Sequence, residues 1–221
     1  MPDPQTAARP RLYHCAAARS FRCLWALEEL GRPYDLVVMP FPPRYAAPEY
    51  LEDNPLGTIP LFLDGDVRMT ESVAICDYLA RKAGSDLAIA TDEPGFGDYC
   101  DLLSFGEATL TTPQTVSLRY GRFARPGEER PEIDQDYRDV FQNRVTRIAD
   151  RLADGSEYLA AGRFTMADIS IGYALILAGF SGNADALAGP LAAYLDRLKA
   201  RDGFKRARAA EKAGGQPDAI D

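Results

Sequence analysis

Glu71 and Ser72 are neighbouring polar residues at the predicted start of a helix, in the segment "RMTESVAICDYL". Unpaired N–H groups and the helix dipole make the first turn of a helix favourable for a carboxylate ligand. The Ser72 hydroxyl can donate to that carboxylate, and the Glu71 carboxylate can accept from an ammonium group. Together they would suit the zwitterionic end of an amino acid. The structural alternative is a helix start with Thr70 as the N-cap and Glu71 in the first turn.

A proline stands directly before an apolar strand in the segment "NPLGTIPLF". A cis peptide bond costs least before proline, and a cis bond here would turn the backbone of Ile59 outward. The N–H and C=O groups of Ile59 would then be able to pair with an extended peptide ligand. The alternative is a trans Pro60 that opens an edge strand.

A third candidate is the turn within "RLYHCAAARSFRCLWALEEL" (residues 11–30). The pattern predicts a strand, a tight turn and an amphipathic helix. At the turn, where a catalytic hydroxyl or thiol would be expected, the chain reads Ala-Ala-Ala-Arg (residues 16–19). The turn therefore either carries an unusual activating group or has lost its chemistry.

The composition narrows the class of function. The chain has 33 acidic and 25 basic residues, a formal charge of -8 that argues against nucleic-acid or anionic-membrane binding. No apolar run approaches the roughly 20 residues that span a bilayer, and the first ten residues lack the apolar core of a signal peptide. We therefore expect a cytoplasmic protein whose four scattered cysteines are reduced. Since His14 is the only histidine, we expect no metal.

The elements that must position these residues fall into two groups. Strands are predicted at 11–15 and 34–39 and in a hairpin over 59–69, and helical segments at 20–30, 48–53 and 70–83. This order implies a mixed sheet flanked by helices. After a polar linker, helices are predicted at about 96–123 with a bend near Pro113, and then at about 133–152, 166–178, 187–199 and 204–213. Thr165 and Asp168 fit a capping box, so we interpret Asp168 as a folding residue.

Four segments together resemble the glutathione transferase family, over about residues 9–213; they are "LYHCAAARSFRCLWALEELG", "NPLGTIPLF", "TESVAICDYL" and "FTMADIS". The resemblance implies an α/β, thioredoxin-like glutathione-binding domain (βαβαββα) at residues 9–84. After it would come a linker at 85–95 and then an all-helical domain at 96–213, which supplies the pocket for the second substrate. It also implies a homodimer and a role in detoxification.

The resemblance further implies how glutathione is bound. Ile59 would pair with the cysteinyl backbone through a cis Pro60, and Glu71 and Ser72 would hold the γ-glutamyl end. Arg44, in the Pro-rich loop "FPPRY", would approach the glycine carboxylate.

The residue that activates the glutathione thiol departs from the family pattern. In serine- and cysteine-type members it lies in the turn after the first strand, where the alignment places Ala18. Four substitutes remain. The order of preference is Arg19 with the surrounding backbone N–H groups, then Ser20, then Tyr13, and the fourth, Cys15, falls short of the turn. Arg19 would place a positive charge beside the thiolate, and Ser20 would donate from the helix start. Tyr13 stands where tyrosine-type members carry their phenol.

The function predicted from this resemblance is a glutathione S-transferase of alkyl or aryl groups. A glutathione thiolate would attack an electrophilic carbon of a small apolar substrate. The pocket for that substrate would include Phe105, Thr111 and Tyr120. The alternative is that these side chains pack in the core between the helices.

Two other functions stay open. The chain would be a non-catalytic glutathione- or ligand-binding protein if the alanines mark a lost activating group. It would be a glutathione-dependent thiol reductase or lyase if a protein cysteine attacked the glutathionyl adduct. Cys15 is the only cysteine close to the turn, and we expect it to be a small core residue. We expect His14 to be packed or hydrogen-bonded, not catalytic.

Overall fold

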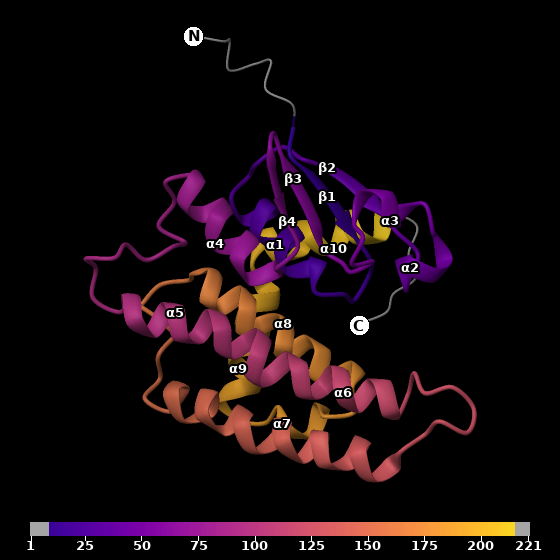
Figure 1. Ribbon diagram of the computed structural model, residues 1–221. Coiled ribbons are helices and arrows are strands. Elements are labelled where there is room, and N and C mark those ends of the chain that lie inside the picture. The colour runs from indigo at the N-terminus through magenta and orange to yellow at the C-terminus, as the bar shows by residue number, and fades with distance from the viewer. Residues whose placement is uncertain (1–8, 215–221) are drawn as a thin grey trace. The chain divides into compact units, whose positions relative to one another are not determined.

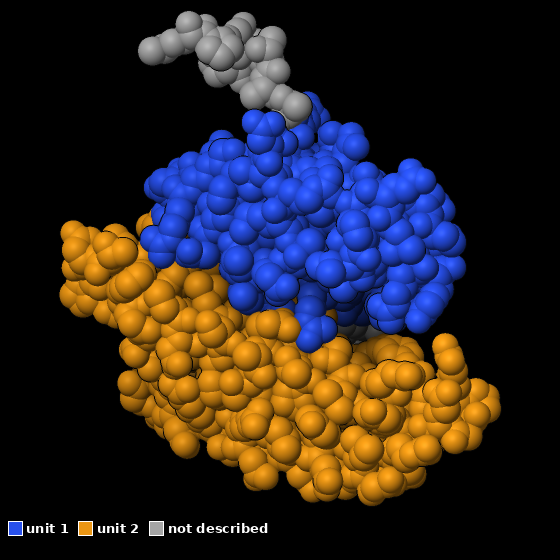
Figure 2. Space-filling model, viewed as in Figure 1, with its two compact units in different colours: residues 1–85, 201–219, 221 blue, residues 86–200, 220 orange. Residues whose placement is uncertain are grey.

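The computed structural model describes residues 9–214, which form two compact units (Figures 1 and 2). Unit 1 contains the described residues up to Ser85 and from Arg201 onward, and unit 2 contains Asp86 to Ala200. The last helix, α10 (Asp202–Ala213), therefore groups with unit 1. The sequence analysis assigned it to the helical domain, because a helical pattern does not reveal which element the helix packs against.

Unit 1 is built on a four-stranded sheet in the order β2–β1–β3–β4. The strands are β1 (Arg11–His14), β2 (Asp35–Val38), β3 (Leu61–Asp64) and β4 (Val67–Met69). Strand β1 runs parallel to β2 and antiparallel to β3. Strands β3 and β4 form the predicted hairpin, with Gly65 at φ 61° in its two-residue turn. The predicted mixed sheet is confirmed.

The two faces of the sheet are covered by different helices. Helices α1 (Ser20–Glu29), α4 (Ser72–Lys82) and α10 lie along one face (Figure 1). Because side chains alternate along a strand, His14 of β1 faces α1 and α10, while Tyr13 packs with Tyr50 in a buried cluster on the opposite side.

Helix α10 is fixed against α1 by an aromatic contact and an ion pair. The ring of Phe204 meets the fully buried ring of Trp25 edge-on, with centroids 5.0 Å apart. Arg201 donates to both carboxylate oxygens of Glu29 at 2.9 Å. The helices approach so closely that a Cβ on Gly203 would lie 2.4 Å from Cδ of Glu29. A side chain at this position would therefore require the Glu29 carboxyl group to shift.

Four local details near the sheet bear on the sequence prediction. The Pro-rich segment contains a short helix, α2 (Pro43–Ala46), because proline suits the first helical position. The predicted turn at 48–53 is helix α3 (Tyr50–Asp53). Helix α4 has Glu71 as its N-cap, so the expectation that Thr70 occupies that position is wrong. The Ile59–Pro60 peptide bond is cis, and so is Phe41–Pro42.

Unit 2 is helical. Its helices are α5 (Phe96–Ser104), α6 (Thr112–Tyr120), α7 (Pro131–Leu152), α8 (Met166–Phe180) and α9 (Pro190–Ala200), with a 3₁₀ turn, η2, at Ala184–Ala186. Helix α8 is buried almost throughout, as its continuous apolar sequence predicts. The capping box of Thr165 and Asp168 is present, and Asp168 also accepts from the Tyr194 hydroxyl at 2.7 Å. None of the described helices is both long and apolar enough to cross a membrane.

The first long helical region contains a π-helix, η1 (Phe105–Thr111), between α5 and α6. Pro113 lies in the first turn of α6, and it has no N–H to donate to the carbonyl of Thr109. Arg144 donates to that carbonyl instead, at 3.4 Å. A Cβ on Gly106 would lie 2.3 Å from Oγ of Ser170, so η1 and α8 meet backbone to side chain. The interruption predicted at the proline is thus a turn of π-helix before it.

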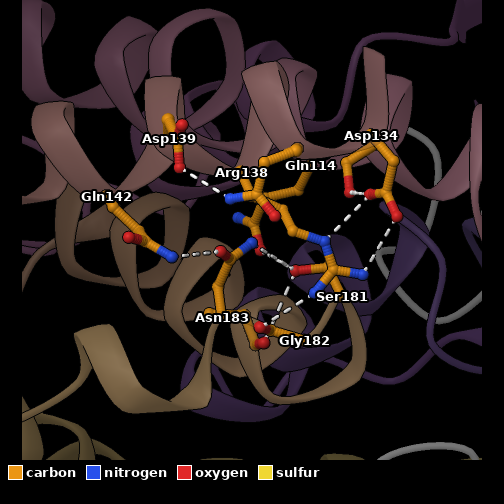
Figure 3. Close-up of polar contacts among 11 residues, drawn as sticks. Gln114, Asp134, Arg138, Asp139, Gln142, Ser181, Gly182 and Asn183 are labelled. Carbon is orange, nitrogen blue, oxygen red and sulfur yellow. Dashed lines mark hydrogen bonds and ion pairs between the residues drawn. The ribbon is translucent and has the colours of Figure 1, made fainter. Parts of the chain in front are cut away.

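A buried polar network joins helices of unit 2 (Figure 3). The Gln114 amide donates to the carbonyl of Ala174 at 2.9 Å and accepts from the Ser181 hydroxyl at 2.8 Å. Asn183 donates to Ser181 and accepts from Gln142. Each buried amide therefore has partners, which avoids the cost of an unsatisfied polar group.

Candidate functional site

The turn after β1 has an uncommon backbone conformation for its residue type. Ala17 has φ 60°, in the left-handed region, which costs a residue with a Cβ about 1–2 kcal/mol. The N–H of Ala18 donates to the carbonyl of Cys15 at 3.2 Å. Arg19 is the N-cap of α1, and the three alanines and Arg19 are half-buried.

A buried network of hydrogen bonds holds the turn after β1 in place. Oε1 of Glu211, in α10, accepts from the Ala17 N–H at 3.2 Å and pairs with Nε2 of His14 at 3.1 Å. Nδ1 of His14 pairs with Oγ of Ser20 at 2.9 Å, and that hydroxyl accepts the Cys15 N–H at 3.2 Å. His14 and Ser20 are fully buried. His14 is therefore hydrogen-bonded, as predicted.

The placement of Ser20 argues against its predicted role as a thiol donor. Its hydroxyl has no exposed surface and is engaged by His14 and by the backbone of Cys15. Ser20 contacts His14, and His14 contacts Glu211, which is the order of nucleophile, base and acid in a catalytic triad. A nucleophile must reach its substrate, however, so we interpret this arrangement as a structural anchor for the turn.

Tyr13 is also committed elsewhere. Its hydroxyl donates to Oδ2 of Asp53 at 2.8 Å, and its ring packs on Tyr50 with centroids 5.4 Å apart. Burial, together with the bond to Asp53, raises the pKa of the Tyr13 phenol. The phenol thus stays protonated with its donor in use, which argues against the predicted activating role.

Cys15 has the surroundings of a core residue. It is fully buried, and its thiol lies 3.6 Å from the carbonyl of Pro40. Burial raises the pKa of the Cys15 thiol to about 12. A thiol of that pKa is not a nucleophile near neutral pH. Among the candidate activating residues, Tyr13, Ser20 and Cys15 are buried, whereas Arg19 is half-buried.

Ile59 lies beside the turn with a backbone that can receive a ligand. Tyr13 pairs with Leu61 in the antiparallel register of β1 and β3, so two residues further on Ile59 comes alongside Cys15. The side chains of Ile59 and Ala18 pack against the same buried cluster. Within residues 9–214, neither the N–H nor the C=O of Ile59 has a hydrogen-bond partner.

The start of α4 is tied to α1 close to the same turn. Ser72 is buried, and its hydroxyl accepts from Nη1 of Arg22 at 3.2 Å. Arg22 is itself fully buried. Glu71 is exposed in extended backbone at the N-cap, with no side-chain bond to the helix.

Two residues of this site were missed in the sequence analysis. Arg22 stands on the buried side of an amphipathic helix, and a charge at such a position was a usable signal. Glu211 lies 194 positions along the chain from Ala17, and no local pattern connects them.

Arg44 lies in α2, next to the loop that leads to Ile59. Its side chain is exposed, with the guanidinium 4.9 Å from the ring centre of Tyr45. A Cβ on Gly57 would lie 2.6 Å from Cβ of Arg44, so the two segments are in contact.

The three residues predicted to line the second-substrate pocket differ in exposure. Thr111 is fully buried and donates to the carbonyl of Gly106 at 2.7 Å, which assigns it to the core of unit 2. Phe105 and Tyr120 are half-buried, and the guanidinium of Arg147 lies 4.7 Å from the ring centre of Phe105. The structure thus leaves Phe105 and Tyr120 as candidate lining residues.

Solved structures of similar fold cover almost the whole chain. A glutathione transferase family member from Pseudomonas fluorescens aligns with a TM-score of 0.80 at 23% identity, over 93% of this chain and 94% of that chain. A glutathione transferase from Methylococcus capsulatus aligns with a TM-score of 0.79 at 24% identity, over 92% and 99% of the two chains. These similarities establish the fold: a thioredoxin-like first domain followed by helices.

Sequence comparison identifies the family. The family described as "Glutathione S-transferase, N-terminal domain" matches residues 18–82. Glutathione S-transferase 4 of Zea mays is 42% identical over 152 residues, which are 67% of this chain and 68% of the relative. Glutathione S-transferase 3 of Schizosaccharomyces pombe is 35% identical over 100 residues, but this match spans only 41% of the relative's length and 45% of this chain. The chain belongs to the glutathione S-transferase family.

Proposed function

We propose that the protein is a catalytic glutathione transferase, which activates the glutathione thiol for attack on an electrophilic carbon of a small apolar substrate. The observation that carries this proposal is the unpaired backbone of Ile59 beside the turn at the start of α1. A bound peptide can pair with that backbone and place its cysteinyl thiol at the turn. The Pseudomonas fluorescens protein of the same fold is described with two glutathione bound, which supports glutathione as the ligand.

The remaining contacts follow from the charges of the tripeptide. The Ser72 hydroxyl and the first N–H groups of α4 would bind the γ-glutamyl carboxylate, and Glu71 would accept from its ammonium group. Arg44, beside the loop that carries Ile59, would pair with the glycine carboxylate. Each terminal charge of glutathione thus meets an opposite charge or a helix dipole in unit 1.

Activation requires a moderate amount of free energy. Lowering the thiol pKa from about 8.5 by about two units raises the thiolate fraction at pH 7 from about 3% to about three quarters, and requires about 2.7 kcal/mol. The N–H groups of Ala17 and Ala18 already donate to Glu211 and Cys15. We therefore assign the activation to the Arg19 guanidinium and to the N-terminus of α1. A charge-assisted hydrogen bond supplies about 1.5–3 kcal/mol, which is of the required size.

The rest of the family architecture is carried over as part of the proposal. The domain boundary is kept at the linker 85–95, with α10 as a segment of the second domain that packs on unit 1. Phe105 and Tyr120 would line the pocket for the electrophile, with Thr111 supporting them from the core. We propose a cytoplasmic homodimer that acts in detoxification.

An ultraviolet difference titration of bound glutathione tests the proposal. The thiolate absorbance of the wild-type complex is expected to rise well below the free pKa of about 8.5. Arg19→Ala is expected to move the transition back by about one pH unit. Arg32→Ala is the matched control, because Arg32 is an exposed arginine of unit 1 away from the turn.

The alternative functions predict other results. Bound glutathione that titrates like the free peptide in the wild type would contradict activation and favour a non-catalytic binding protein. This alternative is supported by the three alanines of the turn, which are partly exposed and have no activating side chain. A thiol reductase or lyase would need Cys15 as its nucleophile, which its burial and raised pKa oppose.

A further inference from the structure

We infer that Glu211 of α10 is a positioning residue for glutathione activation: it holds Ala17 in its left-handed conformation and so fixes Arg19 at the start of α1. The inference rests on the function proposed above. It extends the site to a helix near the other end of the chain, since Glu211 lies 194 positions after Ala17. Glu211 makes no contact with the reacting thiol in this account and acts only through the turn.

One carboxylate oxygen of Glu211 has two partners. Oε1 of Glu211 receives the Ala17 N–H at 3.2 Å and pairs with Nε2 of His14 at 3.1 Å. A carboxylate is an acceptor only, so His14 must donate from Nε2. The same atom therefore joins the last residue of β1 to the middle of the turn.

The carboxylate of Glu211 is itself oriented by a neighbour in α10. Arg208, one turn earlier in α10, donates from Nη1 to Oε2 of Glu211. The guanidinium carbon of Arg208 also lies 5.8 Å from the ring centre of Phe21, on the first turn of α1. Arg208 occupies the second oxygen, and the first oxygen is left to His14 and Ala17. The carboxylate side chain is nearly fully buried, which strengthens these contacts.

The backbone conformation of Ala17 has a cost in free energy. A residue with a Cβ adopts φ near 60° only where the surroundings impose it. The Ala17 N–H bond to Glu211 is a contact that holds Ala17 in the folded protein. Arg19 follows two residues later as the N-cap of α1. A relaxed turn would therefore displace Arg19 relative to the thiol.

The experiment compares two substitutions of equal length. Glu211→Gln keeps an acceptor oxygen, whereas Glu211→Met fills the same space with no good acceptor. Thiol pKa and affinity for glutathione are measured on each complex by ultraviolet titration and calorimetry. We expect Glu211→Met to raise the bound thiol pKa by about one unit, a roughly threefold loss of thiolate at pH 7. Glu211→Gln is expected to raise it less, because its amide oxygen still accepts from Ala17 and His14 while its NH2 group meets the Arg208 donor. Affinity is expected to change less than about twofold, because the predicted contacts of Ile59 and Ser72 are untouched.

The matched control separates this role from simple docking of α10. Glu29→Met removes the other buried carboxylate between α1 and α10, the one bound by Arg201 and Trp25 at the far end of α1. It is expected to lower the thermal midpoint and leave the thiol pKa unchanged. In the Glu211→Met background, Ala17→Gly is expected to recover part of the lost thiolate, since glycine adopts positive φ at little cost.

The outcomes are distinct. Two results would overturn the inference while the proposed function stands. The first is a lowered thiol pKa in the wild type that Glu211→Met leaves unchanged. The second is a rise in the thiol pKa that is as large in Glu29→Met as in Glu211→Met. A wild-type thiol that titrates like free glutathione would overturn the proposed function and the inference with it. If Glu211→Met fails to fold, amide exchange of Ala17 in the wild-type complex is the deciding measurement. The Ala17 N–H is expected to be protected although the residue is half-exposed, and rapid exchange would overturn the inference.

Discussion

Nη1 of Arg22 donates to Oγ of Ser72 at 3.2 Å, and both residues are buried. The bond joins the first turn of α1, which follows the Ala16–Ala18 turn, to the first residue of α4. Activation and recognition of the γ-glutamyl group, which we assign to different helices, are therefore connected by one guanidinium. The bond also leaves the Ser72 hydroxyl hydrogen available for a ligand, because the hydroxyl oxygen is the acceptor.

We predict that Arg22→Met weakens glutathione binding without removing thiol activation. Loss of a charge-assisted bond costs about 1.5–3 kcal/mol at most, so we expect the dissociation constant to rise about tenfold. Calorimetry measures the affinity, and the ultraviolet titration measures the thiol pKa. Arg22→Lys is the comparison, because its ammonium can still donate to Ser72. A thiol pKa that moves more than the affinity would show instead that Arg22 acts on the turn.

We predict that Tyr13→Phe keeps the thiolate signal of bound glutathione. Its hydroxyl already donates to Asp53, and its phenol has a raised pKa. The expected cost is a loss of about 1 kcal/mol or less of unfolding free energy, because the lost hydrogen bond is only partly buried. Denaturant unfolding gives that value, and the titration gives the thiol pKa. Loss of the thiolate signal in this variant would restore the phenol to the activating role.

The sequence predicted those parts of the fold whose signals are local. The hairpin with Gly65, the strand and helix around the alanine turn, and the capping box at Asp168 each rest on turn chemistry or on hydrophobic period, and each is present. Burial of Ser20 was not predicted, because a hydroxyl at a helix start serves equally as a cap or as a ligand donor until its neighbours are known.

Long-range partners account for what the sequence did not predict. Helix α10 has an ordinary amphipathic pattern, and only the fold brings Phe204 to Trp25 and Glu211 to His14. The π-helix before Pro113 likewise makes a close approach to α8, where Gly106 meets Ser170. In both cases the deciding contact joins residues that are far apart along the chain, which periodicity within one segment does not encode.

We predict that Cys15 lowers stability at alkaline pH. Its folded pKa of about 12 lies above the ordinary value of 9.0, so between these values the folded state binds a proton that the unfolded state has lost. The stabilisation is complete below about pH 9 and falls as pH rises. Denaturant unfolding at pH 8 and pH 10 is therefore expected to show a drop about 1 kcal/mol larger in the wild type than in Cys15→Ala. Equal drops in the two proteins would contradict the burial of this thiol.

Alkylation provides an independent check on the same thiol. Of the four cysteines, Cys100 is exposed, and Cys15, Cys23 and Cys76 are buried. Iodoacetamide at pH 8 is expected to modify Cys100 rapidly and Cys15 only after unfolding. Peptide mapping by mass spectrometry identifies the site. Rapid modification of Cys15 in the folded protein would instead support a thiol reductase or lyase.

We predict that Phe204→Ala releases the contact between α10 and α1, and that the single tryptophan of the chain reports it. Phe204 meets both Trp25 and Phe21 edge-on, at 5.0 and 5.6 Å between ring centres. Removing a packed phenylalanine costs about 3–5 kcal/mol, and Trp25 would gain exposure to water. Its emission is therefore expected to shift to longer wavelength in the native state, with an earlier denaturation midpoint.

Phe123→Ala is the matched control for this prediction. Phe123 also packs against another aromatic ring, that of Phe180, but it lies in unit 2 and is exposed. We expect Phe123→Ala to leave the emission of Trp25 unchanged, because it removes no atom from the α1–α10 contact. If Phe204→Ala also left that emission unchanged, α10 would not cover Trp25 in solution. Glu211 would then not be held close to His14 and Ala17, because α10 carries both Phe204 and Glu211.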